Sequence, residues 1–529
     1  MFVSVLLLWI CLCFLLLQFK SRRPKNFPPG PLALPFLGNA LSLSFDNPLK
    51  YFESLRRTYG NVYSVYIGPR AVVVVSGTQA LKEALVNKAV DFAGRPQNLY
   101  VNAIVEDKGV IAANYGQKWK EHRRFALMTM RNFGLGKQSM EQRILGELQH
   151  TINKLEKNTG KSLSAQVMFH NIASNVICLV LFGKRFKYDD EFIIKYVNNF
   201  TEVNKMINGP WSFLYDSFPC IRRLPLPFKE AFKRIQTLKS MTSSIINEHK
   251  KTRVPGYPQD LVDCYLDEMD KRINDGTSFS SEELLMSCLN LHSAGTDTTS
   301  NTLLTGFLYL MTNPQIQERC QQEIDRVLEG KDCVTFDDRH NMPYVQAVVH
   351  ESQRVADTVP LSVFHATTRD TELMGYSIPK GTIVIPNLSS ALNEEGQWKF
   401  PHEFNPENFL NHKGEFVKPD AFLPFSAESQ QERRDTICTV WSCSPDQSPG
   451  AVQSGSSLKP GQRIKTKTRS KTTWTSNKES VFKAPIYYMH IQGGILFSIL
   501  FLSRSSSVSG RRPGPNGALP HHGDSSEEV

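Results

Sequence analysis

Regularly spaced cysteines are absent from this sequence. Its ten cysteines form no CxxC pair and no repeated interval, so no disulfide framework is expected and the thiols of a cytosolic domain should stay reduced. A strong charge of one sign is also absent from the body. Of the formal net charge of +10, the last 102 residues carry +5, with 13 Lys and Arg against 8 Asp and Glu, which leaves +5 for all the rest. A net charge of +5 over the body of the chain is too small to indicate nucleic-acid binding.

The first 20 residues combine a long uncharged run with a one-sided charge. Residues 2–19 contain no charged side chain and would span about 27 Å as a helix. Four Lys and Arg residues follow between positions 20 and 25 and none precede, which places the next domain on the cytosolic side of a membrane. A cleaved signal peptide is the alternative, but its basic residues would lie on the other flank. We predict a transmembrane anchor in contact with lipid at 1–20 and a basic, proline-rich linker at 21–35.

The segment 36–427 has ordinary globular composition and alternates helical periods with short strands. Residues 61–75 are rich in β-branched side chains and are broken by Gly68-Pro69, a pattern typical of a β-hairpin. Residues 78–86 have the period of an amphipathic helix. A helix-rich middle follows, which a cluster of Pro and aromatic residues at 210–228 interrupts. We therefore predict a mainly α domain with small β-sheets.

The strongest helix prediction begins at Ser280, where Ser280 and Glu283 have the spacing of a capping box before an apolar run. The helix should end near Thr312, because Asn313-Pro314 starts a new helix that ends near Gly330. A helix of that length spans about 48 Å and crosses a whole domain.

The middle of this long helix contains Ala294-Gly295-Thr296-Asp297-Thr298-Thr299, which is poor helix-forming material. Small residues let a planar ligand approach the backbone, and a hydroxyl beside a carboxylate can relay protons to bound oxygen. Taken alone, a kink or a tight helix crossing explains the segment better. Similarly, Glu351 and Arg354 share one helix face, but any single ExxR is usually a surface ion pair.

The order in which these motifs occur carries more information than each motif alone. The sequence resembles the microsomal cytochrome P450s of the large vertebrate family two over about four fifths of its length. The matching motifs are PPGP at 28–31, WKEHRR at 119–124, AGTDTT at 294–299, ESQR at 351–354, HATTRD at 365–370, IPKGT at 378–382 and FNPENF at 404–409.

The resemblance implies a role for each matched residue. Trp119, Arg123 and His365 correspond to contacts of a haem propionate, for which the arginine fork is well suited, and Ala294 corresponds to a residue that lines the pocket above the haem. Asp297 and Thr298 correspond to the pair that manages proton delivery and oxygen cleavage. Glu351 and Arg354 correspond to a structural ion pair whose third partner, usually Arg or His, is here Asn408.

The cysteine loop of the resembled family is missing. After Phe425 the family continues as Gly-x-Arg-x-Cys-x-Gly, whose thiolate binds the haem iron, whereas this sequence has Glu428, Gln430, Glu432 and Arg434 at the four diagnostic positions. Neither Cys438 nor Cys443 has the neighbouring Arg and Gly that would stabilise and present a thiolate. The metal ligand is therefore unknown.

Residues 428–529 differ in character from everything before them. They contain 18 serines, repeated Lys, Arg, Thr, Gly and Pro, and no sustained period. Their one apolar run, 495–502, is too short to span a bilayer as a helix. We predict an incomplete cytochrome P450 catalytic domain at 36–427, with its C-terminal part missing or replaced by a disordered tail at 428–529.

Two functions are consistent with this organisation. The resemblance implies an endoplasmic-reticulum monooxygenase that binds haem, accepts electrons from NADPH through a flavoprotein reductase and oxidises a lipophilic molecule. The alternative is a catalytically inactive or unstable variant, caused by a frame, splice or gene-model change near residue 428. A membrane-anchored binding protein has no feature in its favour. Phe213, Leu214 and residues 360–363 suggest an apolar pocket that would suit a xenobiotic, a fatty acid or a steroid.

Overall fold

The computed structural model describes residues 23–34, 37–39, 42, 47–133, 138–158, 163–273, 278–329 and 335–426. The predicted anchor at 1–20, the tail at 428–529 and the two candidate thiols Cys438 and Cys443 lie outside the described residues.

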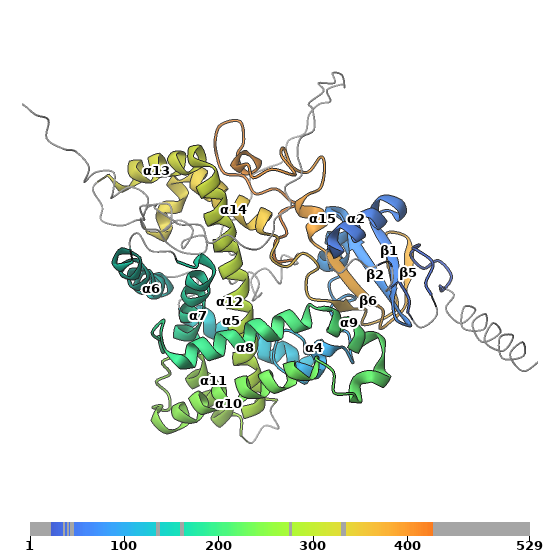
Figure 1. The fold of residues 1–529 in the computed structure, drawn as a ribbon, viewed down its shortest axis with the longest axis horizontal. Coiled ribbons are helices and arrows are strands. Elements are labelled where there is room, and N and C mark those ends of the chain that lie inside the picture. The colour runs from blue at the N-terminus through green and yellow to red at the C-terminus, as the bar shows by residue number, and fades with distance from the viewer. Residues whose placement is uncertain are drawn as a thin grey trace, which may run out of the picture.

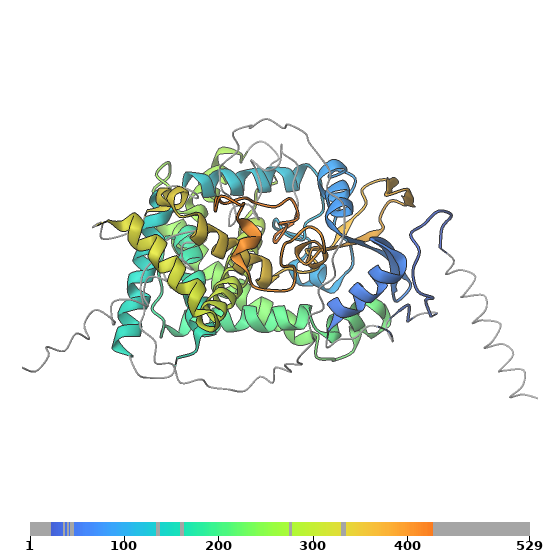
Figure 2. The same cartoon turned by 90° about the horizontal axis from the view of Figure 1, so that it is seen from above.

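Helices make up most of the described chain, and two small β-sheets lie at one side of them (Figures 1 and 2). The α-helices are α2 (Pro48–Tyr59), α3 (Thr78–Lys82), α4 (Tyr100–Val105), α5 (Gln117–Asn132), α6 (Gln138–Lys157), α7 (Ala165–Phe182), α8 (Glu191–Ile207), α9 (Pro210–Ser217), α10 (Lys229–Thr252), α11 (Leu261–Lys271), α12 (Ser281–Thr312), α13 (Pro314–Leu328), α14 (Pro343–Ala356) and α15 (Ser389–Leu392). Short π and 3₁₀ turns are η2 (Glu83–Asn87), η3 (Pro219–Arg223), η4 (Phe336–Asn341) and η5 (Pro406–Phe409). The strands are β1 (Val62–Ile67), β2 (Arg70–Ser76), β3 (His365–Ala366), β4 (Thr371–Leu373), β5 (Tyr376–Ile378) and β6 (Ile383–Asn387). The predicted mainly α fold with small sheets is confirmed.

The larger sheet has the strand order β1-β2-β6-β3, and β4 pairs with β5 in the other. The predicted hairpin is β1 and β2, which are antiparallel, and β2 pairs in parallel with the distant β6. Val72 and Val74 pack on one face in a cluster that includes Phe52 of α2, while Val73 and Val75 pack on the other face with the cluster of α3. Because both faces are covered, β2 is a continuous apolar run instead of an alternating one.

Helix α12 confirms the predicted long helix, but only half of the predicted capping box forms. The Ser280 hydroxyl accepts a hydrogen bond from the Glu283 backbone N–H at 3.2 Å. The Glu283 carboxylate does not return to Ser280. Instead, it accepts from the backbone N–H of Gly109 at 3.0 Å and pairs with Lys118. The start of α12 therefore anchors a distant loop as well as its own first turn.

Helix α7 is the main partner of α12 in the core. Among the described residues it is also the one helix long and apolar enough to cross a membrane, but 61% of that window is buried inside the protein. Twelve of its side chains are buried, and the apolar ones pack into the large cluster around α12. Its hydropathy is accounted for by this core position.

The proline and aromatic cluster at 210–228 separates the long helices α8 and α10, as predicted, and is itself partly helical. It contains α9, which begins with Pro210 at its first position, and the 3₁₀ turn η3, which begins with Pro219. Proline is well tolerated there because the first helical N–H groups have no partner within the helix. The cluster thus starts short helices as well as ending long ones.

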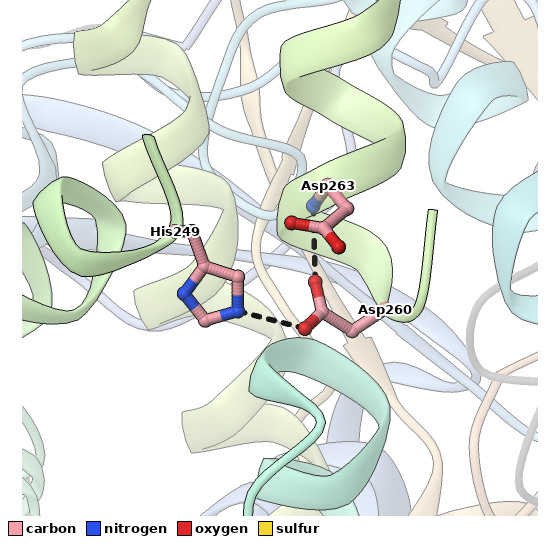
Figure 3. Close-up of side chains that lie close together, drawn as sticks. All are labelled: His249, Asp260 and Asp263. Atoms are coloured by element: carbon pink, nitrogen blue, oxygen red, sulfur yellow. Dashed lines mark hydrogen bonds and ion pairs between the residues drawn. The ribbon is translucent and has the colours of Figure 1, made fainter. Parts of the chain in front are cut away.

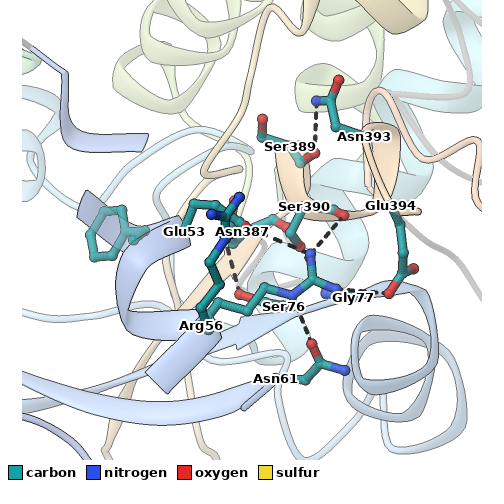
Figure 4. Close-up of polar contacts among 12 residues, drawn as sticks. Glu53, Arg56, Asn61, Ser76, Gly77, Asn387, Ser389, Ser390, Asn393 and Glu394 are labelled. Atoms are coloured by element: carbon teal, nitrogen blue, oxygen red, sulfur yellow. Dashed lines mark hydrogen bonds and ion pairs between the residues drawn. The ribbon is translucent and has the colours of Figure 1, made fainter. Parts of the chain in front are cut away.

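Two polar junctions fix the ends of elements. At the α10–α11 junction, the His249 imidazole donates to Asp260, the N-cap of α11, at 2.7 Å (Figure 3). At the sheet edge, Arg56 of α2 pairs with Glu394 at 2.8 Å, and the same carboxylate accepts from the Thr78 backbone N–H at the start of α3 (Figure 4). Segments more than 300 residues apart are held together by this second junction.

Candidate functional site

Trp119 and Arg123, two of the three residues predicted to contact a propionate, lie beside one loop that α12 fixes in place. Asn290 of α12 accepts hydrogen bonds from the backbone N–H groups of Val110 and Ile111, at 3.2 and 3.0 Å. The carbonyls of the same two residues then accept from side chains. The Trp119 indole N–H donates to Val110 O at 3.0 Å, and Arg95 Nε donates to Ile111 O at 3.0 Å. The central helix therefore positions both side chains through the loop.

Arg123 lies one helical turn after Trp119 on α5, and its guanidinium stacks on the indole ring at 4.9 Å. This cation–π contact holds the arginine in a fixed place. The indole N–H is already donated to a carbonyl, and the indole ring packs against the guanidinium of Arg123.

His365 belongs to β3, and the backbone beside it brings Arg95 close. The Ala366 N–H donates to Gly94 O at 2.7 Å, and His365 Nδ1 donates to Phe92 O at 2.7 Å. Burial, followed by the positive charge of Arg95, lowers the pKa of His365 to about 3. The imidazole is therefore neutral, and its Nε2 can bind a carboxylate only after taking up a proton, which a carboxylate beside it would favour.

A half-open cavity of about 690 Å³ adjoins Arg95. Three cationic side chains line it, those of Arg70, Arg95 and Lys380, and no Asp or Glu among the described residues does. The other lining residues are Ala71, Gly94, Pro96, Gln97, Asn98, Asn114, Tyr115, Ala366, Thr367, Thr368, Gly381, Thr382 and Ile383. Such a lining suits an anionic group better than the lipophilic substrate for which an apolar pocket was predicted.

Asp297 and Thr298 lie side by side on α12, but their side chains make different contacts. The Thr298 hydroxyl donates to Ala294 O at 2.7 Å. The Asp297 carboxylate accepts from Asn204 of α8 and pairs with His170 of α7 at 3.3 Å. Hydrogen bonding to Asp297 raises the pKa of His170, although burial opposes it. The Asp297 carboxylate therefore contacts two neighbouring helices, α7 and α8, while the Thr298 hydroxyl bonds within α12.

Glu351 and Arg354 form a buried pair and not the surface pair that an isolated ExxR would suggest. They are 0% and 1% exposed, and Arg354 Nε and Nη2 each contact a Glu351 oxygen at 2.7 Å. Arg354 also donates to the carbonyls of Leu392, Pro401 and Glu403. The guanidinium donors that Glu351 does not use thus hold the segment 392–403 against α14.

Asn408 fills the third place in this ion-pair core. Its amide donates to Glu351 Oε1 at 3.1 Å and to Phe400 O at 3.1 Å, and its carbonyl accepts from the Phe400 N–H at 2.8 Å. The expected hydrogen bond is present without a second positive charge, and the same side chain also fixes the backbone at Phe400.

The described cysteines do not supply a thiolate at this site. Cys178, Cys220, Cys264, Cys288 and Cys320 lie on α7, η3, α11, α12 and α13, and none of them is on α5 or β3, which carry Trp119, Arg123 and His365. Burial raises the pKa of Cys178 to about 12 and that of Cys264 to about 11. Both are neutral thiols, which are poor metal ligands.

Arg95 and Asn290 belong to this site in the structure but are not among the predicted residues. Arg95 belongs to no motif that was matched, and Asn290 precedes the AGTDTT segment by one helical turn. The available signal was a charged residue between a glycine and a proline, Gly94-Arg95-Pro96.

The fold and this ordered set of residues define a class of protein, the haem monooxygenases. The chain belongs to the cytochrome P450 family, whose model matches residues 28–427. Cytochrome P450 2F3 of Capra hircus is 40% identical over 426 residues, and cytochrome P450 2B4 of Oryctolagus cuniculus is 40% identical over 428 residues. Cytochrome P450 2B2 of Rattus norvegicus is 41% identical over 428 residues, and each match covers 80% of this chain and 87% of the relative.

Members of this family bind haem, and the residues present fit one side of that group. Arg95 and Arg123 are cationic side chains of the kind that binds carboxylates, and His365 could join them only after taking up a proton. On the other side no ligand for the iron is identifiable among the described residues. The chain is thus a cytochrome P450 by fold and sequence, and its family is one of oxidoreductases.

Proposed function

We propose that this chain derives from an enzyme that inserts one atom of dioxygen into a lipophilic organic substrate, such as a xenobiotic, a fatty acid or a steroid. Electrons would come from NADPH through a flavoprotein reductase, and the anchor at 1–20 would hold the domain on the cytosolic side of the endoplasmic-reticulum membrane. The observation that supports this most is the arrangement of cationic side chains at the loop that α12 fixes. Arg95 donates to this loop, and Arg123 stacks on Trp119, which also donates to it. His365 lies near Arg95.

Each residue has a proposed task. When bound, the haem would supply the oxygen chemistry. Arg95 and Arg123 would hold its carboxylates by charge-assisted hydrogen bonds, and His365 would join them once protonated. Ala294 would leave room above the ring. The Thr298 hydroxyl, which now donates to Ala294 O, would exchange that bond to carry a proton, and Asp297 would supply protons through its contact with His170.

A second candidate rests on a specific observation, the lack of any cysteine between Cys333 and Cys438. That interval includes Glu432, which stands where the family has its ligand. A chain without a thiolate at the iron cannot direct electron density towards the O–O bond. In this second candidate the protein keeps the family scaffold but is catalytically inactive or unstable, because of a change of frame, splicing or gene model near residue 428.

The reduced carbon monoxide difference spectrum of the full chain in detergent distinguishes the two candidates. For the sequence as written we expect no band of thiolate-ligated haem, and Cys438→Ser and Cys443→Ser should give the spectrum of the parent chain. A thiolate band that one of these substitutions abolishes would overturn this expectation and establish an active enzyme with a displaced ligand.

A further inference from the structure

Three potential metal ligands meet at the α10–α11 junction, on helices that carry none of the residues assigned to haem. His249 lies in the last turn of α10, Asp260 is the N-cap of α11 and Asp263 lies in its first turn. One ligand atom from each lies within 4.8 Å of the other two. Figure 3 shows the imidazole and the two carboxylates facing a common space between the helices.

The hydrogen bonds of this cluster leave one oxygen unused. Asp260 accepts from His249 Nε2 at 2.7 Å and from the Asp263 backbone N–H at 3.0 Å, so both of its oxygens have partners. Asp263 Oδ2 accepts from the Gln259 N–H at 3.1 Å. Asp263 Oδ1 is buried, and among the described residues it has no hydrogen-bond partner. Asp263 is only 5% exposed, and buried carboxylates are normally paired or bound to a metal.

The groups packed around the cluster do not neutralise that oxygen directly. Arg143 of α6 faces Asp260, and Asp267 faces Asp263 but is itself paired with Arg253 at 2.6 Å. The side chain of His249 is 15% exposed, compared with 3% for that of Asp260. The junction therefore has a solvent-accessible edge at the imidazole, through which an ion could enter.

We propose that His249, Asp260 and Asp263 bind a zinc ion, with water as a further ligand, and that the ion fixes the turn between α10 and α11. One imidazole and two carboxylates are a ligand set that zinc accepts in tetrahedral geometry. Calcium and magnesium prefer more ligands, all of them oxygen. Asp263 Oδ1 gains a partner in this arrangement, and His249 binds the ion through the nitrogen that now donates to Asp260. The proposal is independent of haem binding.

The test uses the full chain in detergent, freed of metal by a chelator and then equilibrated with Zn²⁺. Bound zinc is measured after gel filtration, and the midpoint of thermal unfolding is measured with and without Zn²⁺. Asp263→Asn removes the negative charge of the carboxylate while keeping the shape of the side chain, and His249→Gln removes the imidazole. The control is His402→Gln, which removes an imidazole paired with the exposed Glu395 at 2.9 Å.

We expect the parent chain and His402→Gln to bind one zinc ion more than Asp263→Asn and His249→Gln do, or to bind zinc at least about tenfold more tightly. Zinc should raise the unfolding midpoint in the first pair only, because an ion that binds the folded state stabilises it. Other thiol and imidazole groups contribute equally to all four chains. Equal zinc uptake by all four, or no effect on the midpoint of the parent, would overturn the proposal.

A second measurement decides the question if the variants do not fold. Co²⁺ added to the parent chain should give the visible ligand-field absorption of a four-coordinate site, and Zn²⁺ should displace it while Mg²⁺ should not. An absorption typical of six-coordinate aqueous Co²⁺ would rule out the site.

Discussion

At the scale of single residues, the Glu351–Arg354 pair shows how burial changes the meaning of a motif. A surface ExxR contributes little to stability because water and salt screen it. Here the pair is buried away from water, and the guanidinium N–H groups that Glu351 does not use donate to the carbonyls of residues 392, 401 and 403. These partners come from 38 to 49 residues downstream, so no local pattern could have revealed them.

Replacing Arg354 with Lys should destabilise the protein strongly although the charge is kept. Lysine is a point charge that cannot make the bidentate contact with Glu351 and the carbonyl contacts together. We expect a loss of about 3 kcal/mol or more in the free energy of unfolding, because breaking a buried pair leaves polar groups without partners. Urea unfolding followed by circular dichroism measures this loss.

The matched control is Arg57→Lys, which changes an exposed helical pair. Arg57 contacts Glu53 at 3.2 Å, with 78% and 41% of the two side chains exposed. Its effect should stay below about 1 kcal/mol. Similar losses for both substitutions would show that the buried network has no special contribution.

At the scale of elements, the sequence predicts several helices and the hairpin, but it does not predict the contact between Asn290 and the loop at 109–111. The long helix, the hairpin and the start of α13 follow from caps, periodicity and turn residues, all of which are local. The contact of Asn290 with the loop at 109–111 joins segments about 180 residues apart. Glu283 has the spacing for a capping box and yet turns to Gly109, because a tertiary partner is available.

Asn290→Ala should make the loop at 109–111 more mobile, together with Trp119 and Arg95, whose side chains donate to its carbonyls. The substitution leaves the N–H groups of Val110 and Ile111 without their acceptor, which costs about 1–3 kcal/mol for buried groups. Hydrogen exchange should therefore speed up at 109–111 and at the first turn of α5, while α13 should keep its protection. The control is Asn301→Ala, on an exposed position of the same helix. Equal protection of the loop in both variants would contradict the docking role of Asn290.

At the scale of the whole molecule, the fold depends on contacts between residues that are far apart in the sequence, and local sequence patterns do not predict these contacts. The run of valines in β2 predicts a strand buried on both faces, but its parallel partner β6 begins more than 300 residues later. The same limit applies to Arg95, because the contacts that position it, from Gly94 to Ala366 and from Arg95 to Ile111 O, are not visible in the local sequence. The boundaries at 36 and 427 and the nature of the tail stay predictions.

Three neutral histidines in different parts of the fold, His292 fully buried and the other two partly buried, should make the whole molecule sensitive to acid. Burial lowers the pKa of His292 on α12 to about 3, that of His350 on α14 to about 4 and that of His365 on β3 to about 3. In the unfolded chain each would take up a proton below pH 6.5, the ordinary value. The unfolded state therefore binds more protons between pH 6.5 and about 4, and stability falls as the pH is lowered through this range.

His350→Phe should reduce the pH dependence of the free energy of unfolding by the contribution of one titrating imidazole. The ring lies 4.5 Å from Phe416 and 5.3 Å from Phe422, so a phenyl group fits the aromatic cluster. Between about pH 6 and pH 4.5, the free energy of unfolding of the variant should fall less steeply than that of the parent, by about 1.4 kcal/mol per pH unit for one proton. Urea unfolding at several pH values measures both slopes, and the difference at about pH 8, where the imidazole is neutral in both states, isolates the change in packing. If the free energies of unfolding of the variant and the parent fall in parallel across the acid range, His350 is already protonated in the folded protein. Only an imidazole that stays neutral in the folded state and takes up a proton on unfolding makes stability depend on pH in this range.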